Sequence, residues 1–282
     1  MKKLVNKIKY LRQIGLVPSV VLIARKFFKI ESVFFKKNKN LFCGRGVEIA
    51  GPSSIFQLNS YCPVYKYAES LDNVNYSSTT RWHGLMGVDH SFIFNKNKEG
   101  GRQIINEASQ LIDINDASYD FLISNHMLEH SANPIKVLHE WRRVVKPGGA
   151  LLVVLPHKNK TFDRRRPLTK LSHLIEDYQA NIGEDDQTHL NEIVQMYDFS
   201  MDYSNPSIEK LLEWMQDNVN KRGAHHHVFD GRLSLDLMDY VGFEILDIEI
   251  SSPSNIFLYL RNPQKNSNIS NLDFMKNPIT EL

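Results

Sequence analysis

Histidines and carboxylates of this 282-residue chain stand directly after two short apolar runs. His126 follows the run Asp120–Ser124, and His157 and Asp163 follow the run Ala150–Leu155. An unperturbed imidazole titrates near neutral pH, so His126 suits the role of a general base or of a substrate ligand. We expect His157 and Asp163 to contact a substrate, since open α/β sheets bind ligands beyond the carboxyl ends of their strands.

A glycine-containing string, GRGVEIAGPSSIF at Gly44–Phe56, could form a loop for a nucleotide-type ligand. Glycine lets a ligand approach the backbone closely because no Cβ stands in the way. However, the string lacks the GxGxxG spacing of a dinucleotide-binding loop, and Pro52 stands where a helix would begin. By itself the string fits an ordinary strand and turn as well as a cofactor loop.

A run of three histidines, His225–His227, raises the question of a metal site together with Asp185, Asp186 and His189. Side chains of adjacent residues diverge from a strand or a helix, so neighbouring histidines rarely share one ion. The sequence favours a structural or substrate-lining role for the run, and we expect no metal.

Seven segments are predicted strands, because each is short, apolar and bounded by Gly, Pro, Asn or Asp. They are Val47–Ala50, Val64–Ala68, Gln103–Asn106, Asp120–Ser124, Ala150–Leu155, Phe243–Ile250 and Ile256–Leu260. A helix is predicted over Pro134 to Val145, ended by the PGG of Pro147–Gly149. The order strand, helix, strand predicts an α/β fold with a mostly parallel, doubly wound sheet. The link Ser251–Asn255 is too short for a crossover helix, so the last two strands form an antiparallel hairpin.

Composition divides the chain into a body and two ends. Hydrophobic residues make up 42% of the sequence and aromatic residues 10%, which is enough for the core of one large domain over 41–262. Within that domain, residues 158–240 are rich in charge and histidine and follow the fifth predicted strand. We expect this insertion to form a cap over the substrate site. Residues 263–282 are rich in Asn and Ser, and we expect a flexible tail there.

Residues 1–40 carry eleven Lys or Arg and the single acid Glu31, a local charge of +10 against +2 for the whole chain. Apolar and basic residues at helical spacing predict amphipathic helices here. Two interpretations stay open, which are packing on the body and contact with a membrane surface or an acidic partner. The run IGLVPSVVLIA contains Pro18 and is too short to span a bilayer. The two cysteines, Cys43 and Cys62, make no disulfide framework, and we expect a cytoplasmic protein.

Two segments together resemble a known family. They are SYDFLISNHMLEH at Ser118–His130 and WRRVVKPGGALLVVLPH at Trp141–His157. An apolar strand with an acidic and aromatic entry, then LEH, a helix, KPGG and a second apolar strand is similar to class I S-adenosylmethionine-dependent methyltransferases. The resemblance runs from about Gly44 to Leu260. It is nearest to a bacterial subgroup with an ExGGPS-like loop, LEH, PGG, LPHxxxTFD and HHHVFD, which read here as VEIAGPS, HMLEH, KPGG, LPHKNKTFD and HHHVFD.

The resemblance implies S-adenosylmethionine as the cofactor, held by a Rossmann-like sheet with a helical cap. It implies that Glu48 faces the cofactor site and helps to hold the ammonium group of the cofactor, directly or through water, and that Gly51 gives the first loop an open turn. Ala50 stands where the family usually has glycine, which places a methyl group where the cofactor comes closest.

The resemblance also implies contacts beyond the first loop. The family has an acid after the second strand that accepts hydrogen bonds from the ribose, and this role falls to Asp72, with Glu69 as the alternative. Glu107 and the backbone of Ala108 are implied to meet the adenine. Asn125 is implied to lie beside the transferable methyl group, although a plain capping role at the strand end stays open.

We expect transfer of a methyl group to a small-molecule or glycan-type acceptor, with O-methylation favoured because a histidine can take the hydroxyl proton. The alternative is a catalytically inactive methyltransferase-like protein that serves as a binding partner or scaffold. An NAD-type oxidoreductase would need GxGxxG, which the sequence lacks. Nucleic acid is not an expected partner, since +2 for the chain less +10 for its first forty residues leaves −8 for the rest.

Overall fold

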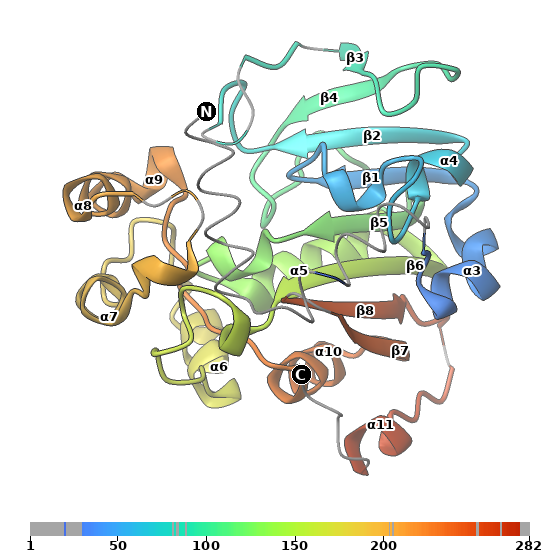
Figure 1. The fold of residues 1–282 in the computed structure, drawn as a ribbon. Coiled ribbons are helices and arrows are strands. Elements are labelled where there is room, and N and C mark those ends of the chain that lie inside the picture. The colour runs from blue at the N-terminus through green and yellow to red at the C-terminus, as the bar shows by residue number, and fades with distance from the viewer. Residues whose placement is uncertain are drawn as a thin grey trace.

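In the computed structural model, the described part of the chain folds around one eight-stranded sheet (Figure 1). The structure describes residues 20, 30–80, 82, 85–87, 89–202, 204, 206–251, 254–265 and 267–276. Most of the predicted N-terminal helical region and the end of the predicted tail lie outside the described residues.

The strands are β1 (Arg45–Ile49), β2 (Ser70–Asn75), β3 (Asp89–Phe92), β4 (Gly101–Ile105), β5 (Tyr119–Asn125), β6 (Val145–Pro156), β7 (Glu244–Ser251) and β8 (Asn255–Arg261). The helices are α3 (Val33–Asn38), α4 (Val64–Tyr67), α5 (Pro134–Val144), α6 (Leu171–Gln179), α7 (Leu190–Met196), α8 (Ile208–Gln216), α9 (Asn218–Lys221), α10 (Gly231–Val241) and α11 (Leu272–Lys276).

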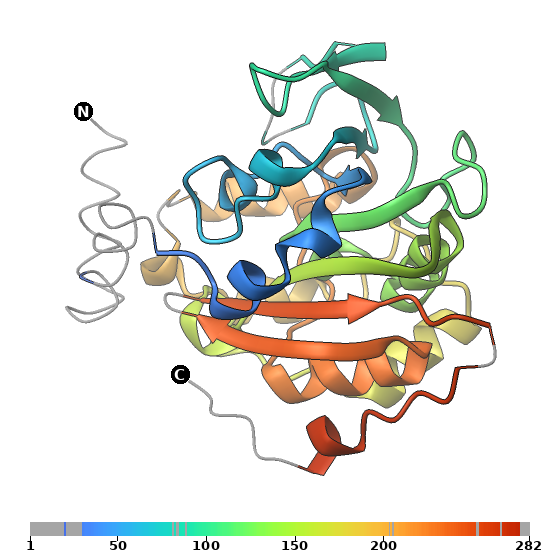
Figure 2. The same cartoon turned by 90° about the vertical axis from the view of Figure 1, so that its right-hand side faces the viewer.

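The middle of the sheet is parallel, and both of its edges are antiparallel. The strand order is β3-β4-β2-β1-β5-β6-β8-β7, in which β4, β2, β1, β5 and β6 run parallel. β3 pairs antiparallel with β4, while β8 lies antiparallel between β6 and β7. Figure 2 shows β7 and β8 side by side, with α10 packed close to them. The predicted Rossmann-like α/β sheet with an antiparallel C-terminal hairpin is confirmed, with eight strands in place of seven.

The prediction of a strand at Val64–Ala68 is wrong. Val64–Tyr67 is the short helix α4, which follows Pro63 and buries Val64 and Tyr65 against the sheet. The second parallel strand is β2, whose sequence SLDNVN has no apolar run by which patterning could detect it. Hydrogen bonds satisfy the buried polar side chains of β2, so this strand can lie inside the sheet without an apolar sequence.

Two hydrophobic cores cover the two faces of the sheet, and successive residues of a strand contribute to opposite cores. In β5, Leu122 packs in the core that includes α5 and α10, whereas Phe121 and Ile123 pack in the core that includes α3 and α4. In β6, Leu151 and Leu152 divide between the cores in the same way. Burial on both faces explains why these strands are continuous apolar runs in the sequence.

The helix predicted over Pro134 to Val145 is confirmed as α5. The side chain of Asn133 caps its start by accepting a hydrogen bond from the backbone N of Lys136 (3.1 Å), and Pro134 occupies the first turn. Within β6, Gly148 adopts a φ of 84°, a left-handed conformation that glycine tolerates. The parallel pairing with β5 is irregular around this residue, with Val145 opposite Tyr119 and Ala150 opposite Phe121.

Helices α6 to α9 gather at one side of the sheet, next to the ends toward which β2 and β4 point (Figure 1). These helices belong to the predicted cap, residues 158–240. They have a small core of their own, in which Ile193, Leu211 and Met215 are buried. The cap therefore packs as a unit beside the carboxyl edge of the sheet, where ligands of open α/β sheets bind.

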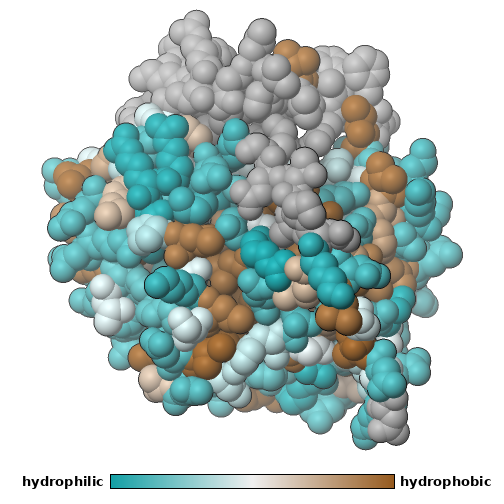
Figure 3. Space-filling view, turned by 90° about the horizontal axis from the view of Figure 1, so that it is seen from below, coloured by the Kyte–Doolittle hydropathy of each residue, from teal (hydrophilic) through white to brown (hydrophobic). Residues whose placement is uncertain are grey.

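The molecular surface is mixed in character. The face in Figure 3 is mostly hydrophilic, with hydrophobic side chains in small groups between polar ones. Single hydrophobic residues such as Ile208 and Leu272 are exposed, and scattered residues of this kind need no partner. No helix in the described part of the chain is long and apolar enough to cross a membrane.

Candidate functional site

A large cavity of about 1070 Å³ lies at the carboxyl ends of the parallel strands. One wall comes from the ends of β2 and β5 and from the segments that follow β1 and β4, and the cap forms the other wall. The lining includes Ala50, Ser53, Asn75, Tyr76, Glu107, Ala108, Asn125 and His126 from the sheet side, and Phe162, Glu184, Tyr197, Lys210, Trp214, Arg222 and His225 from the cap. Segments far apart in the sequence thus meet at the edge of the sheet where ligand binding is expected.

Glu48 supports the first loop from behind and does not line the cavity. Its carboxylate is fully buried and accepts hydrogen bonds from the backbone N of Ser53 (2.9 Å) and from Tyr65 Oη (2.6 Å). Burial raises the pKa of Glu48 to about 7, although these two donors oppose the shift. A direct contact between Glu48 and the ammonium group of a cofactor is therefore corrected, because Glu48 holds the loop in shape, and a contact through water stays a prediction.

Ala50 and Gly51 form the turn of this first loop. Ala50 lines the cavity with a φ of 64°, a left-handed conformation that glycine adopts at lower cost. The backbone N of Gly51 donates to Asn73 Oδ1 (2.9 Å), and a Cβ added at Gly51 would lie 2.3 Å from Glu48 Cδ. The loop therefore requires glycine at position 51, and the cofactor contacts implied for Ala50 and Gly51 stay predictions.

The buried carboxyl of Glu48 gives a pH-dependent contribution to stability. Its pKa is raised from 4.5 to about 7 by folding, so the folded state holds the proton more tightly than the unfolded state. The contribution is fully present below 4.5 and is lost as the pH rises toward and through about 7. With glutamine in place of Glu48, the free energy of unfolding should fall by roughly 3 kcal/mol less over this pH range. Urea unfolding of both proteins across this pH range measures the difference, and parallel pH profiles would contradict the assignment.

Asp72 lies away from the cavity, and the ribose contact implied for it is wrong. It stands in the interior of β2, where its carboxylate accepts hydrogen bonds from Arg102 Nε (3.1 Å) and Tyr119 Oη (2.7 Å). Burial would raise the pKa of Asp72, but the hydrogen bonds and charge of these partners outweigh it and lower the pKa. The alternative, Glu69, precedes β2 and does not line the cavity either. Asn75, the last residue of β2, lines the cavity instead.

Glu107 and Ala108 line the cavity after β4, and the contact with adenine implied for them stays a prediction. The carboxylate of Glu107 pairs with Arg222 from the cap, and Arg222 Nη1 also lies 3.0 Å from Glu184 Oε2. The guanidinium of Arg222 stands over the ring of Tyr76, 5.0 Å from its centroid. Arg222 thus joins the two walls of the cavity. It is 115 residues from Glu107, so no sequence spacing predicts the contact.

Asn125 and His126, at the end of β5, both line the cavity as expected. His126 has a φ of 49°, and its Nε2 lies 3.0 Å from Asn255 Oδ1. Burial lowers the pKa of His126 to about 4 in spite of this hydrogen bond. His126 is therefore neutral at physiological pH, and its partner is an amide that cannot stabilise an imidazolium as a carboxylate would.

His157 and Asp163 are both buried, and neither of them lines the cavity. His157 Nδ1 accepts a hydrogen bond from the backbone N of Asn159 (3.3 Å) and so caps a short helical turn. Asp163 Oδ2 lies 2.6 Å from His225 Nδ1, and Asp163 Oδ1 accepts a hydrogen bond from Arg166 Nη1 (2.9 Å). The expected direct contact of His157 and Asp163 with a substrate is therefore corrected. Asp163 instead positions His225, which does line the cavity.

His225 is a functional candidate that the sequence analysis does not single out within the run of three histidines. Its ring packs between those of His130 and Phe162, with centroid distances of 4.4 and 4.7 Å. Burial would lower the pKa of His225, but the neighbouring carboxylate of Asp163 outweighs it and raises the pKa. That carboxylate also fixes Nδ1 as the protonated nitrogen of the neutral ring, so Nε2 is the acceptor. The two residues are 62 positions apart, and only folding of the cap brings them together.

Glu129, in the LEH string, is a second candidate at this wall of the cavity. Its side chain is 1% exposed, and its carboxylate oxygens have no hydrogen-bond partner among the described residues. Burial raises the pKa of Glu129 to about 7. An unpartnered carboxyl beside His130 and His225 marks this end of the cavity as the place for a polar ligand.

Comparison with known proteins bears on what this cavity binds. Residues 76–153 match the family described as a methyltransferase domain. The matched segment runs from the end of β2 into β6 and includes the Glu107, Asn125 and Glu129 side of the cavity. The chain therefore carries a methyltransferase domain, for which S-adenosylmethionine is the methyl donor. The match supports the resemblance to class I methyltransferases, and the bacterial subgroup stays a prediction.

Solved structures show the same general arrangement at low similarity. A methyltransferase from Mesorhizobium loti is 11% identical over 82% of this chain and 98% of its own, with a TM-score of 0.46. A methyltransferase from Methanosarcina mazei is 15% identical over 78% of this chain and 92% of its own, with a TM-score of 0.44. One from Aquifex aeolicus is 13% identical over 86% of this chain and 97% of its own, with a TM-score of 0.40. All three are described as S-adenosylmethionine-dependent. A search of the curated proteins gives no match.

Proposed function

We propose that the protein transfers the methyl group of S-adenosylmethionine to a hydroxyl group of a small-molecule or glycan-type acceptor. One observation carries this proposal. A single cavity joins the loops at the carboxyl ends of the parallel strands to the cap, and a buried histidine–carboxylate pair, His225 and Asp163, stands in its wall. The strand-end loops of the cavity suit the cofactor, and the His225–Asp163 pair suits removal of a proton from an acceptor.

The cofactor would lie along the sheet side of the cavity. Ala50 and the loop around it would receive the methionine portion, while Glu107 and the backbone of Ala108 would receive the adenine. Because Asp72 is turned to Arg102 and Tyr119, the ribose would meet Asn75 and the chain that follows it. An amide can accept and donate hydrogen bonds to ribose hydroxyls without a charge.

The acceptor would lie on the cap side, which combines aromatic and hydrogen-bonding groups. Phe162, Tyr197 and Trp214 present rings there, and Asp202 and Lys210 present charged groups. Flat rings beside polar side chains suit a compound that has both C–H faces and hydroxyls, such as a sugar ring. This composition favours the cap, residues 158–240, as the part that selects the acceptor.

The reaction would be an in-line displacement at the methyl carbon. The acceptor oxygen forms a bond to that carbon as the carbon–sulfur bond breaks, which leaves S-adenosylhomocysteine. The hydroxyl proton passes to Nε2 of His225, and Asp163 stabilises the imidazolium that results. Charge on the sulfonium is neutralised in this step, so alignment of the reactants and exclusion of water matter most.

The test is transfer of a labelled methyl group from S-adenosylmethionine to a panel of hydroxylated small molecules and oligosaccharides. We expect label in a product that resists mild alkali, as an ether does and an ester does not. Label only in carboxyl esters or amines would contradict the proposed acceptor. Cofactor binding without transfer to any panel member would favour the alternative, an inactive methyltransferase-like binding protein.

A further inference from the structure

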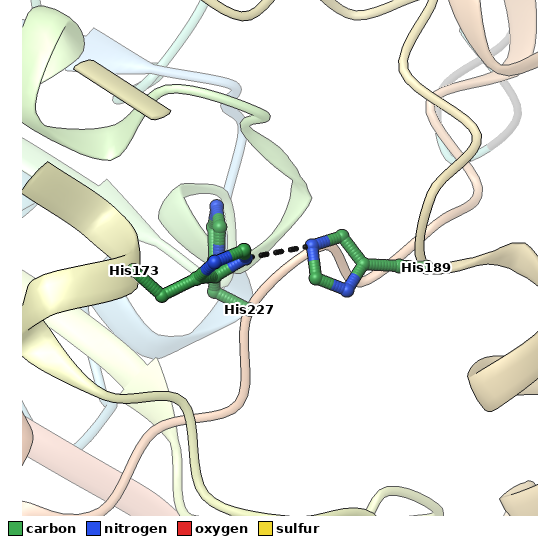
Figure 4. Close-up of side chains that lie close together, drawn as sticks. All are labelled: His173, His189 and His227. Atoms are coloured by element: carbon green, nitrogen blue, oxygen red, sulfur yellow. Dashed lines mark hydrogen bonds between the residues drawn. The ribbon is translucent and has the colours of Figure 1, made fainter. Parts of the chain in front are cut away.

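A second group of histidines lies in the cap, among residues that do not line the cofactor cavity. His173 on α6, His189 directly before α7 and His227 before α10 bring their imidazoles together from three separate segments (Figure 4). Asp177 lies one helical turn after His173 on the same face of α6, with its carboxylate close to two of the rings.

We propose that His173, His189, His227 and Asp177 bind one divalent transition-metal ion such as Zn²⁺. Zinc in proteins binds imidazole nitrogens and carboxylate oxygens in tetrahedral geometry, with bonds near 2.0 to 2.2 Å, so that two ligand atoms stand about 3.3 Å apart. Nε2 of His173 lies 3.1 Å from Nε2 of His189 and 3.5 Å from Asp177 Oδ2. Nε2 of His227 lies 3.7 Å from the same oxygen and donates a hydrogen bond to the backbone O of Ala132 (3.3 Å), a bond that it would give up to bind the ion. The group therefore has the ligand types of a zinc site, in which the nitrogens of the three histidines lie within 4.8 Å of one another and the carboxylate of Asp177 lies beside two of them.

Two further features of the group suit a cation. Asp177 Oδ2 is buried without a hydrogen-bond partner in the described part of the chain, which is costly unless something else satisfies it. Neutral imidazoles have a free lone pair, and the carboxylate supplies the negative charge that a divalent ion prefers.

This site revises the expectation that the chain has no metal. The side chains of the three adjacent histidines do diverge, since His225 pairs with Asp163 and His226 bonds to Asn218, and of the three only His227 joins the metal group. Its partners His173 and Asp177 have the spacing of one helical turn. Four protein ligands close the coordination shell, so the ion would tie α6, the start of α7 and the segment before α10 together and leave the chemistry to the cavity.

The test uses the full-length protein without a purification tag. After treatment with a chelator, calorimetric titration with ZnCl₂ should give one ion per chain, and Co²⁺ should give the visible absorption bands of a tetrahedral site. The unfolding temperature should rise when Zn²⁺ is added, because a closed site stabilises the fold to which it binds. Absence of binding at micromolar Zn²⁺ and Co²⁺ by the folded protein would overturn the proposal.

Variants locate the ion. His189→Ala should weaken Zn²⁺ binding by more than about 100-fold, and His189 is half-buried, which makes the substitution tolerable for folding. Asp177→Asn should weaken binding while keeping the shape of the side chain. The control is His139→Ala on α5, a histidine outside the group, which should bind Zn²⁺ as the unchanged protein does. Equal losses in the His139 and His189 variants would overturn the site.

Discussion

Replacing His225 with asparagine is expected to lower the turnover number for methyl transfer by about 100- to 10,000-fold, the range for loss of a general base. Affinity for S-adenosylmethionine should change little, because His225 stands in the cap wall with Asp163 and the implied cofactor contacts lie at the strand ends. Asparagine can still donate a hydrogen bond to Asp163, so the buried carboxylate keeps a partner. Steady-state kinetics with a labelled methyl donor measure the turnover number, and calorimetry measures the cofactor affinity.

His126 gives a matched comparison for this prediction. It also lines the cavity, but its Nε2 bonds to the amide of Asn255 and burial lowers its pKa to about 4, so it is a poor proton acceptor. His126→Asn should therefore reduce the turnover number far less than His225→Asn. If His126→Asn lowered the turnover number more than His225→Asn did, and His225→Asn stayed near normal, His126 would be the general base. That result would contradict the role of the His225–Asp163 pair.

Replacing Gly51 with alanine is expected to weaken S-adenosylmethionine binding by at least about 10-fold and to destabilise the fold by about 1 to 3 kcal/mol. The added Cβ would lie 2.3 Å from Glu48 Cδ and 2.5 Å from Glu48 Oε2. Glu48 cannot turn aside easily, because Ser53 and Tyr65 hold its carboxylate inside the protein. The first loop must move instead, and with it the wall formed by Ala50.

The control for this prediction is Gly183→Ala in the cap. There the added Cβ meets only the side chain of Asp185, at 2.8 Å, in an exposed segment, so both stability and cofactor affinity should stay near normal. Denaturant unfolding and calorimetric titration give the two quantities for each variant. If Gly51→Ala binds the cofactor as tightly as Gly183→Ala does, the first loop is not part of the cofactor site.

The parts of the fold that sequence patterning predicts are those in which local signals and burial agree. β5, β6 and β8 contain apolar runs buried on both faces, and α5 has Asn133 as its cap and Pro134 in its first turn. The Pro-Gly-Gly that was expected to end the helix lies within β6. The sequence does not predict β2, because its buried residues include Asp72 and the asparagines that follow it. Hydrogen bonds satisfy these polar side chains in the interior, and a search for apolar runs cannot detect them. Because the second strand is predicted too early in the sequence, the acid expected after that strand is Asp72, which lies inside β2.

The candidate site divides in the same way. Ala50, Glu107 and His126 lie in the cavity because they follow parallel strands, and that relation between chain order and space can be read from sequence. The contacts of Arg222 with Glu107 and of His225 with Asp163 depend on how the cap packs on the sheet. Those contacts join residues 115 and 62 positions apart, so they become visible only in the folded chain.

Calorimetric titration of the unchanged protein with S-adenosylmethionine tests the central claim most directly. The account predicts one cofactor per chain, with weaker binding in Gly51→Ala and normal binding in His225→Asn. Absence of heat at millimolar cofactor, in a protein that unfolds cooperatively and is therefore folded, would contradict the claim that the cavity at the strand ends is a methyl-donor site.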